Sequence, residues 1–118
     1  MVMKKVGWIL IGLVICSFAF QTQLQTGKAS YYANKFEGRR TSSGEVFRQD
    51  SLTAAHKNLP FGTMLRVKNL KNDSIVIVKV NDRLSQKSAH IIDLSLKAAQ
   101  QLNFVRNGIT TVTIEKIN

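Results

Sequence analysis

Hydrophobic and polar residues alternate along several short stretches of the chain, a pattern typical of strands with one buried face. The alternation begins at Gly27, in GKASYYA, and recurs over residues 63–70. The pair Asn72–Asp73 then predicts a tight turn. Residues 74–80 read SIVIVKV with hardly a polar break, which predicts a strand covered on both faces.

The pattern changes to helical spacing toward the C-terminus. Ser95 can cap a helix and Asn103 can end it. The apolar positions between them recur at helical intervals: Leu96, Ala99 and Leu102. A last alternating stretch at 109–117 predicts a strand. Five or six strands and one short helix in so short a chain predict a small closed β-barrel, because closure removes exposed sheet edges.

The first residues are typical of an export signal. Lys4 and Lys5 precede an apolar run over 6–20, and small residues near Ala19 suit a signal peptidase. The run is shorter than the roughly 20 residues that a membrane-spanning helix needs. An uncleaved N-terminal anchor is the alternative. The predicted organisation is a signal peptide at 1–19, a short tether at 20–26 and one domain at 27–118.

Composition then narrows the chemistry and the partners. Cys16 is the only cysteine and lies in the predicted signal, which excludes disulfides, thiolate nucleophiles and sulfur-ligated metals from the mature chain. A formal net charge of +10 predicts an anionic partner, and export favours wall polymers or phospholipid head groups over nucleic acid. A solvated, self-repelling surface is the alternative. We expect no cofactor, no stable membrane insertion after signal cleavage, and a monomer in the periplasm, the cell envelope or the exterior.

Two acidic residues and a histidine stand where predicted strands give way to loops. Asp82 follows the most apolar strand, so we expect its carboxyl at the barrel's mouth, where burial would raise its pKa. An aspartate that accepts backbone N–H bonds at a turn is the alternative. Glu45 and His56 also have ordinary interpretations, as a surface charge and a packed histidine. The spacing fits neither an H-E-x-x-H zinc site nor a G-x-S-x-G nucleophile, and we expect no metal.

Four motifs follow one another along the predicted domain: GKASYYANKFEGRRTSSGEVF, LTAAHKNLPFGTMLRVKNL, IVIVKVNDR and IIDLSLKAAQQL. Their order and spacing resemble the RlpA (rare lipoprotein A) family, which is related to expansin-like modules. The resemblance implies a mainly β fold, a small six-stranded double-psi β-barrel with one or two short helices. It also implies an endolytic lytic transglycosylase that cleaves the β-1,4 bond between N-acetylmuramic acid and N-acetylglucosamine in peptidoglycan, during wall remodelling or septal cell separation. The alternative is a non-catalytic, expansin-like module that binds or loosens the wall.

The resemblance also implies roles for individual residues. Asp82 in VNDR would be the acid that later becomes a base, with Glu45 and His56 as the other catalytic residues. The implied substrate-binding residues are Tyr31, Tyr32, Arg39, Thr41, Asn81, Arg83 and Asp93. The family usually continues VNDR with Gly-Pro, whereas Leu84–Ser85 stand here, in a loop expected to border the groove.

Overall fold

Six strands close into a barrel in a computed structural model that describes residues 23–118. The predicted signal peptide at 1–19, and its anchor alternative, lie outside the described residues. The strands are β1 (Leu24–Tyr31), β2 (Thr53–His56), β3 (Met64–Asn69), β4 (Ile75–Arg83), β5 (Ile92–Leu94) and β6 (Thr110–Lys116). The short helices are the 3-10 helix η1 (Asn34–Phe36) and α2 (Leu96–Gln101). The predicted mainly β, six-stranded barrel with one or two short helices is confirmed.

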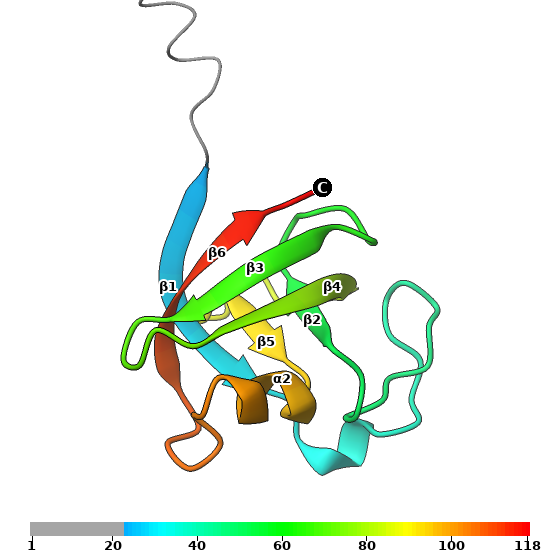
Figure 1. The fold of residues 1–118 in the computed structure, drawn as a ribbon. Helices are drawn as coiled ribbons and strands as arrows, with labels where there is room; N and C mark the ends of the chain where they lie inside the picture. The colour runs from blue at the N-terminus through cyan, green and yellow to red at the C-terminus, as the bar shows by residue number, and fades with distance from the viewer. Residues whose placement is uncertain (1–22) are drawn as a thin grey trace, which may run out of the picture.

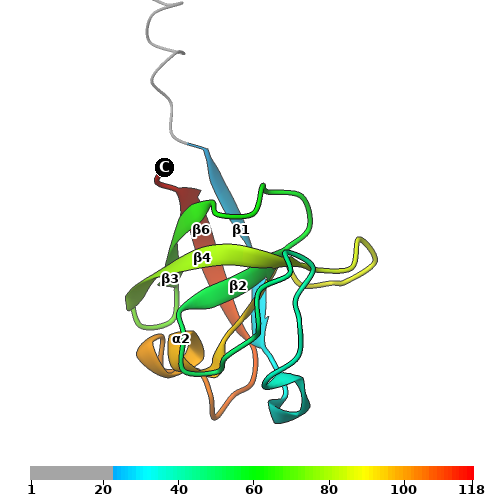
Figure 2. The ribbon, with the colours of Figure 1, turned by 90° about the vertical axis from the view of Figure 1, so that its right-hand side faces the viewer.

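The strands follow one another around the barrel in the order β1-β5-β2-β4-β3-β6 (Figure 1). The β1–β5 and β2–β4 pairs are parallel, and the other neighbours are antiparallel. Figure 2 shows the loop between β4 and β5 projecting from the side of the barrel. No helix within residues 23–118 is long and apolar enough to cross a membrane.

Alternating apolar residues fill the interior, as the pattern predicts for β3 and β6. The buried strand residues include Leu65, Val67, Val76, Val78, Val80, Ile92, Leu94, Val112 and Ile114. Helix α2 lies across the end of the barrel away from the C-terminus (Figures 1 and 2) and buries Ala98 and Ala99 there. Its predicted ends are confirmed: the Ser95 hydroxyl accepts a hydrogen bond from the Ala98 N–H, and Asn103 follows with a left-handed φ of 56°.

Three details differ from the expectations. β1 begins at Leu24, so residues 24–26, expected in a tether, pair with β6; backbone pairing does not require apolar side chains. β4 is not covered on both faces, because Ile75 on its outer face is 50% exposed. β4 also runs on to Arg83, so Asp82 lies inside the strand and does not follow it.

Candidate active site

A β-bulge turns Asp82 toward the outside of the barrel. Ala54 pairs with Val80, but the next residue, Ala55, pairs with Asp82, which leaves Asn81 as an extra residue in β4. Strict alternation from the buried Val80 would return Asp82 to the core side. The bulge places it beside Ala55 on the outer face, and bulges next to functional sites often redirect a side chain in this way. Asp82 therefore lies on the barrel wall and not at its mouth.

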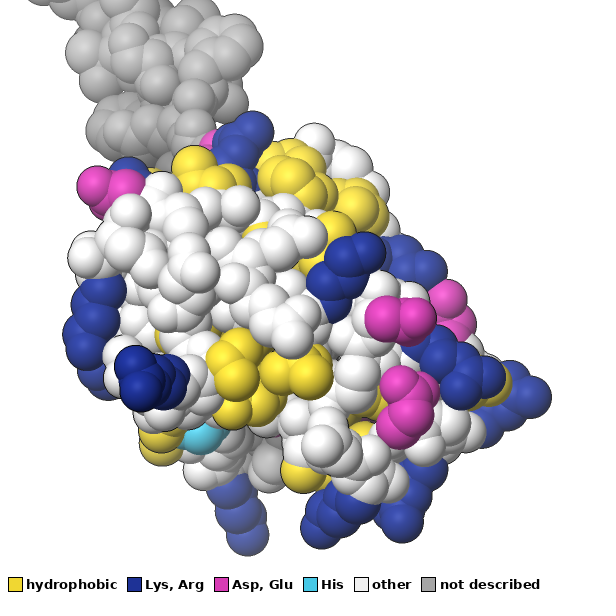
Figure 3. Space-filling model, turned by 60° about the horizontal axis from the view of Figure 1, so that its bottom comes forward, with side chains coloured by type: hydrophobic (Ala, Val, Ile, Leu, Met, Phe, Trp, Pro, Cys, Tyr) yellow, Lys and Arg dark blue, Asp and Glu magenta, His cyan; other side chains and the backbone are white. Residues whose placement is uncertain are grey.

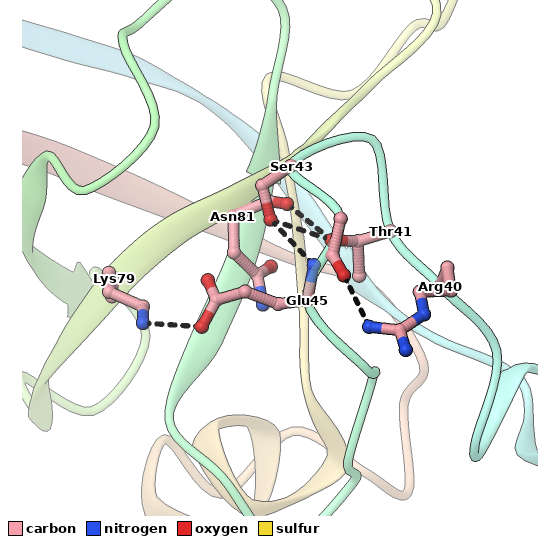
Figure 4. A network of polar contacts seen from close by, with 7 residues as sticks. Arg40, Thr41, Ser43, Glu45, Lys79 and Asn81 are labelled. Atoms are coloured by element: carbon pink, nitrogen blue, oxygen red, sulfur yellow. Dashed lines mark hydrogen bonds and ion pairs between the residues drawn. The ribbon is translucent and has the colours of Figure 1, made fainter.

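The loop between η1 and β2 is bound to this bulge. The Thr41 hydroxyl donates to the Asn81 carbonyl at 2.7 Å (Figure 4). The Ser43 N–H donates to the same carbonyl at 3.3 Å. The Thr41 and Ser43 hydroxyls also lie 2.9 Å apart. Because the bulge removes Asn81 from the regular pairing with β2, these contacts satisfy its carbonyl. Thr41 and Asn81, expected to bind substrate, therefore also fix the backbone next to Asp82.

Three donors surround the Asp82 carboxylate. The Tyr32 hydroxyl donates to Oδ2 at 2.5 Å, and the N–H groups of Ser42 and Arg83 donate to Oδ1 at 2.8 and 2.9 Å. Burial alone would raise the pKa of Asp82, but the hydrogen bonds from Tyr32, Ser42 and Arg83 outweigh it and hold the pKa below its usual value. The expectation of a raised pKa is therefore wrong for the ligand-free domain. Both interpretations of Asp82 apply: it accepts backbone N–H bonds, as an aspartate at a turn does, and its carboxyl also faces a cavity, as a catalytic acid requires.

The cavity beside Asp82 has a volume of about 310 Å³. Ala55 lies on its wall and pairs with Asp82 on one side and Asp93 on the other. Two carboxyl groups thus flank one small side chain, which leaves space between them. Leu84–Ser85, the departure from the family pattern, also line this cavity, so these two residues help to set its shape.

The two tyrosines expected to bind substrate, Tyr31 and Tyr32, line the cavity, but each is also packed against the protein. The Tyr32 ring stacks on Phe47 with centroids 4.2 Å apart. The Tyr31 ring meets Phe104 edge to face, and its hydroxyl donates to the Val105 carbonyl at 2.8 Å. Among the residues that line this cavity, the exposed large aromatic is Phe36, with 36% of its surface accessible. Sequence reasoning missed Phe36, because it lies in an irregular polar segment without a periodic signal.

The two arginines predicted to bind substrate contact aromatic rings. The Arg83 guanidinium lies 4.2 Å from the centroid of Phe61, and its Nη1 donates to the His56 carbonyl at 3.3 Å. Arg83 reaches the Asp82 carboxylate through its backbone N–H, whereas its guanidinium makes its contacts elsewhere. The Arg39 guanidinium lies 5.7 Å from the centroid of Phe36, which lines the cavity, but Arg39 itself is not part of the lining.

Glu45 lies outside the lining of the Asp82 cavity. Its Oε2 is 2.8 Å from the ammonium of Lys79 on β4 (Figure 4), and its side chain is 47% exposed. Glu45 belongs to the loop that carries Ser42, which donates to Asp82. The structure therefore connects Glu45 with Asp82 through the loop and not by direct contact.

His56 is buried and faces a different cavity. Its Nδ1 accepts the N–H groups of Asn58 and Leu59, both at 3.2 Å, so its Nε2 donates to Gln25 Oε1 at 3.0 Å. Burial, followed by the charges of Arg83 and Lys57, lowers the pKa of His56. The cavity that His56 lines has a volume of about 530 Å³ and is bounded by the start of β1 and the end of β6.

The structure thus brings together only part of the predicted set. The predicted residues that line one cavity are Tyr31, Tyr32, Asp82, Arg83 and Asp93. Figure 3 shows Lys and Arg side chains around the edge of the face at the α2 end, with hydrophobic side chains nearer its centre. Within residues 23–118, no group of three or more His, Cys, Asp or Glu side chains could hold a metal ion.

Comparisons with known proteins agree with this architecture. A 23% identical structure, the Streptomyces papain inhibitor, superposes with a TM-score of 0.66 and covers 81% of this chain and 96% of its own. The expansin of Clavibacter michiganensis is 20% identical, with a TM-score of 0.65, and the alignment covers 81% of this chain and 51% of the expansin. These likenesses concern the double-psi β-barrel fold.

Closer relatives appear among curated sequences. The endolytic peptidoglycan transglycosylase RlpA of Neisseria meningitidis is 50% identical over 93 residues, which are 79% of this chain and 39% of the relative. The protein of the same name from Campylobacter jejuni is 47% identical over 91 residues, 77% of this chain and 33% of the relative. The chain thus spans well under half the length of these relatives. The family described as "Lytic transglycolase" matches residues 24–114. That match begins with β1, ends within β6 and takes in most of the chain, so the chain belongs to the lytic transglycolase family, together with the RlpA proteins.

Proposed function

We propose that this domain is an endolytic lytic transglycosylase, which cleaves the β-1,4 bond between N-acetylmuramic acid and N-acetylglucosamine and leaves a 1,6-anhydro end. The names of the relatives support this activity. The observation that carries it is the position of Asp82, whose carboxylate lines an open cavity and is fixed by three donors. A reactive group held in one orientation is what proton transfer to a bound sugar requires.

The first step needs a proton on the departing oxygen while positive charge develops at the sugar carbon C1. Asp82 gives this proton to the glycosidic oxygen as the C1–O bond breaks. In the ligand-free domain its pKa is lowered, so the glycan itself must favour the protonated form. A sugar that fills the cavity excludes water from Asp82, and this added burial raises a carboxyl pKa.

The second step returns the proton to Asp82. The C6 hydroxyl of the same sugar attacks C1, an O–C bond forms, and the Asp82 carboxylate accepts the hydroxyl proton. Because the nucleophile is tethered to the electrophile, no water has to be positioned, and the effective molarity is high. One carboxyl can therefore serve as acid and then as base.

The other predicted residues support Asp82 in this proposal. Glu45 and His56 act indirectly, Glu45 through the loop that carries Ser42 and His56 through the turn that follows β2. Asp93 and Arg83 offer polar groups to the sugar, and Phe36 offers an exposed ring edge or face.

The substrate and location follow from the same proposal. The partner is the glycan strand of peptidoglycan, and the site of action is the cell envelope, either the periplasm or the exterior. The excess of Lys and Arg over acidic residues suits an anionic wall polymer. The domain acts as a monomer.

The test is a product analysis with purified chain and purified peptidoglycan. Anhydro-muropeptides detected by mass spectrometry are expected for the wild type and absent for Asp82→Asn, with the fold checked by circular dichroism. Asp73→Asn is the matched control, because Asp73 is exposed in the β3–β4 turn and asparagine tolerates its left-handed φ of 61°. Binding of peptidoglycan without anhydro products, under conditions where a known enzyme works, would contradict the proposal and favour the non-catalytic, expansin-like module.

A further inference from the structure

Hydrogen bonds to its backbone and aromatic contacts to its ring hold Tyr32 in one position, with its hydroxyl against Asp82. Its backbone N–H donates to the Leu94 carbonyl at 2.9 Å, and its carbonyl accepts from Gln49 Nε2 at 2.8 Å. Its ring is stacked on Phe47 and meets the Phe36 ring edge to face, with centroids 5.8 Å apart. The hydroxyl then lies 2.5 Å from Oδ2 of Asp82, a short hydrogen bond to a charged acceptor.

Tyr32 differs from the other two donors to Asp82. Both backbone N–H donors bind Oδ1, whereas the Tyr32 hydroxyl binds Oδ2. Oδ2 is therefore the oxygen whose orientation and protonation depend on a side chain. When a proton sits on Oδ2, the Tyr32 O–H can no longer donate to that oxygen as it does to the carboxylate, and this opposes protonation.

We propose that Tyr32 is a positioning residue that acts through Asp82, by directing Oδ2 toward the cavity and by delaying proton uptake until a glycan is bound. The proposal rests on the function proposed above. It differs from the substrate-binding role that the resemblance implies for Tyr32, since Phe47 covers one face of its ring. Burial, together with Asp82, raises the pKa of Tyr32, so the phenol keeps its proton and remains a donor throughout the working pH range.

Other titratable groups on the cavity contact different partners. Tyr31 on β1 donates to the Val105 carbonyl, Arg83 on β4 lies over Phe61, and Asp93 on β5 accepts from the Ser30 hydroxyl. His90 also approaches Asp93, at 3.7 Å. Among the titratable side chains that line the cavity, Tyr32 is thus the one that hydrogen-bonds the Asp82 carboxylate.

The test is a ¹³C NMR titration of the Asp82 carboxyl in the ligand-free chain, with Asp82→Asn used for assignment. In Tyr32→Phe the stacked ring remains and one donor to the carboxylate is lost. The midpoint should move to higher pH by about one unit, the size expected for one hydrogen bond to a charged group. Tyr31→Phe is the matched control, because it removes a neighbouring hydroxyl that does not touch Asp82, and its midpoint should equal that of the wild type. An unchanged midpoint in folded Tyr32→Phe overturns the proposal.

A second measurement covers the case in which Tyr32→Phe does not fold. Replacing tyrosine by 3-fluorotyrosine in the Tyr31→Phe chain gives Tyr32 a more acidic phenol, hence a stronger donor, and should move the Asp82 midpoint to lower pH. No movement in this protein also overturns the proposal. Both titrations need no substrate, so they distinguish failure of this role from failure of the proposed activity.

With peptidoglycan as substrate, the same role predicts a change in the pH profile. If Asp82 must be protonated to start the reaction, the alkaline limb of kcat should move to higher pH in Tyr32→Phe, while kcat at the optimum falls because Oδ2 is less well directed. A loss of stability with an unmoved limb would mark Tyr32 as merely structural and overturn the positioning role.

Discussion

Glu45 and Lys79 form an ion pair, 2.8 Å long, that joins the loop before β2 to the outer face of β4 (Figure 4). The loop also supplies the Ser42 N–H to Asp82 and two donors to the Asn81 carbonyl. The ion pair is therefore one of several attachments that hold the loop against the bulge. Because both side chains are more than a third exposed, solvent screens their attraction.

This arrangement predicts that Glu45 and Lys79 act as a unit. Glu45→Gln and Lys79→Ala should each lower kcat/KM on peptidoglycan by up to about tenfold, equivalent to 1.4 kcal/mol of transition-state stabilisation. The double variant should be no worse than either single one, and the coupling in chemical unfolding should be about 0.2–1 kcal/mol. Lys68→Ala, which breaks the exposed pair with Asp73, serves as the control. Complete loss of turnover in Glu45→Gln alone, with Lys79→Ala active, would show that Glu45 touches the substrate.

His56 predicts a pH dependence of stability. Burial, then the charges of Arg83 and Lys57, lowers its pKa in the folded state, so below about pH 6.5 the unfolded chain binds more protons than the folded one. The contribution of His56 to stability is therefore present above the unfolded pKa and is lost as the pH falls toward the folded pKa. Urea unfolding of the wild type should give a lower free energy at pH 5 than at pH 7.5.

Replacing the histidine should remove this part of the pH dependence. His56→Gln loses the acceptor for the Asn58 and Leu59 N–H groups, which should cost about 1–3 kcal/mol at pH 7.5 and less at pH 5. His90→Gln, which changes the other histidine, is the control variant. Equal pH dependence in the wild type and His56→Gln would mean that another group is responsible.

Gly27 in β1 is close to a branched side chain of the β4–β5 loop. A Cβ added at Gly27 would lie 2.6 Å from Cγ2 of Ile91, and that methyl group is attached directly to a stiff branch point. Gly27→Ala should therefore destabilise the fold by about 1–3 kcal/mol, as overpacking does. Adding Ile91→Ala should recover part of this loss in a double-mutant cycle. If the double variant is instead as unstable as the sum of the single ones, the contact with Ile91 is not the cause.

The regular part of the fold could be predicted from local sequence. Alternation in β3 and β6, the Asn72–Asp73 turn and both ends of α2 depend on neighbouring residues, and the structure confirms them. The prediction that both faces of β4 are covered was wrong, because branched residues such as Ile75 also occur on the exposed face of a strand.

The arrangement around Asp82 could be predicted only as a list of residues. IVIVKVNDR carries no signal of a bulge at Asn81, because the apolar pattern ends one residue before it. The pKa of Asp82 is lowered and not raised because of hydrogen bonds from Tyr32 and Ser42, which are 50 and 40 positions away in the chain. The partial burial of Asp82 could be inferred from the apolar strand before it, whereas these donors could be identified only once the folded structure was known.

The contact between Thr41 and the bulge gives the most direct test of how the site is built. Thr41 Oγ1 donates to the carbonyl of the extra residue, Asn81, at 2.7 Å, and Asp82 comes next in the chain. Thr41→Val keeps the shape of the side chain and removes the donor, so the carbonyl keeps only the longer bond from Ser43. We expect a loss of about 1 kcal/mol in unfolding free energy and a fall of about tenfold to a hundredfold in kcat, since a small misplacement of a reacting group has a large effect on rate. Thr113→Val on β6 changes the same atoms away from the cavity and should leave kcat unchanged. The comparison separates two explanations of Thr41: a role in substrate binding alone would raise KM and leave the ligand-free Asp82 titration unmoved, whereas a role in holding the bulge should disturb that titration before any glycan is added.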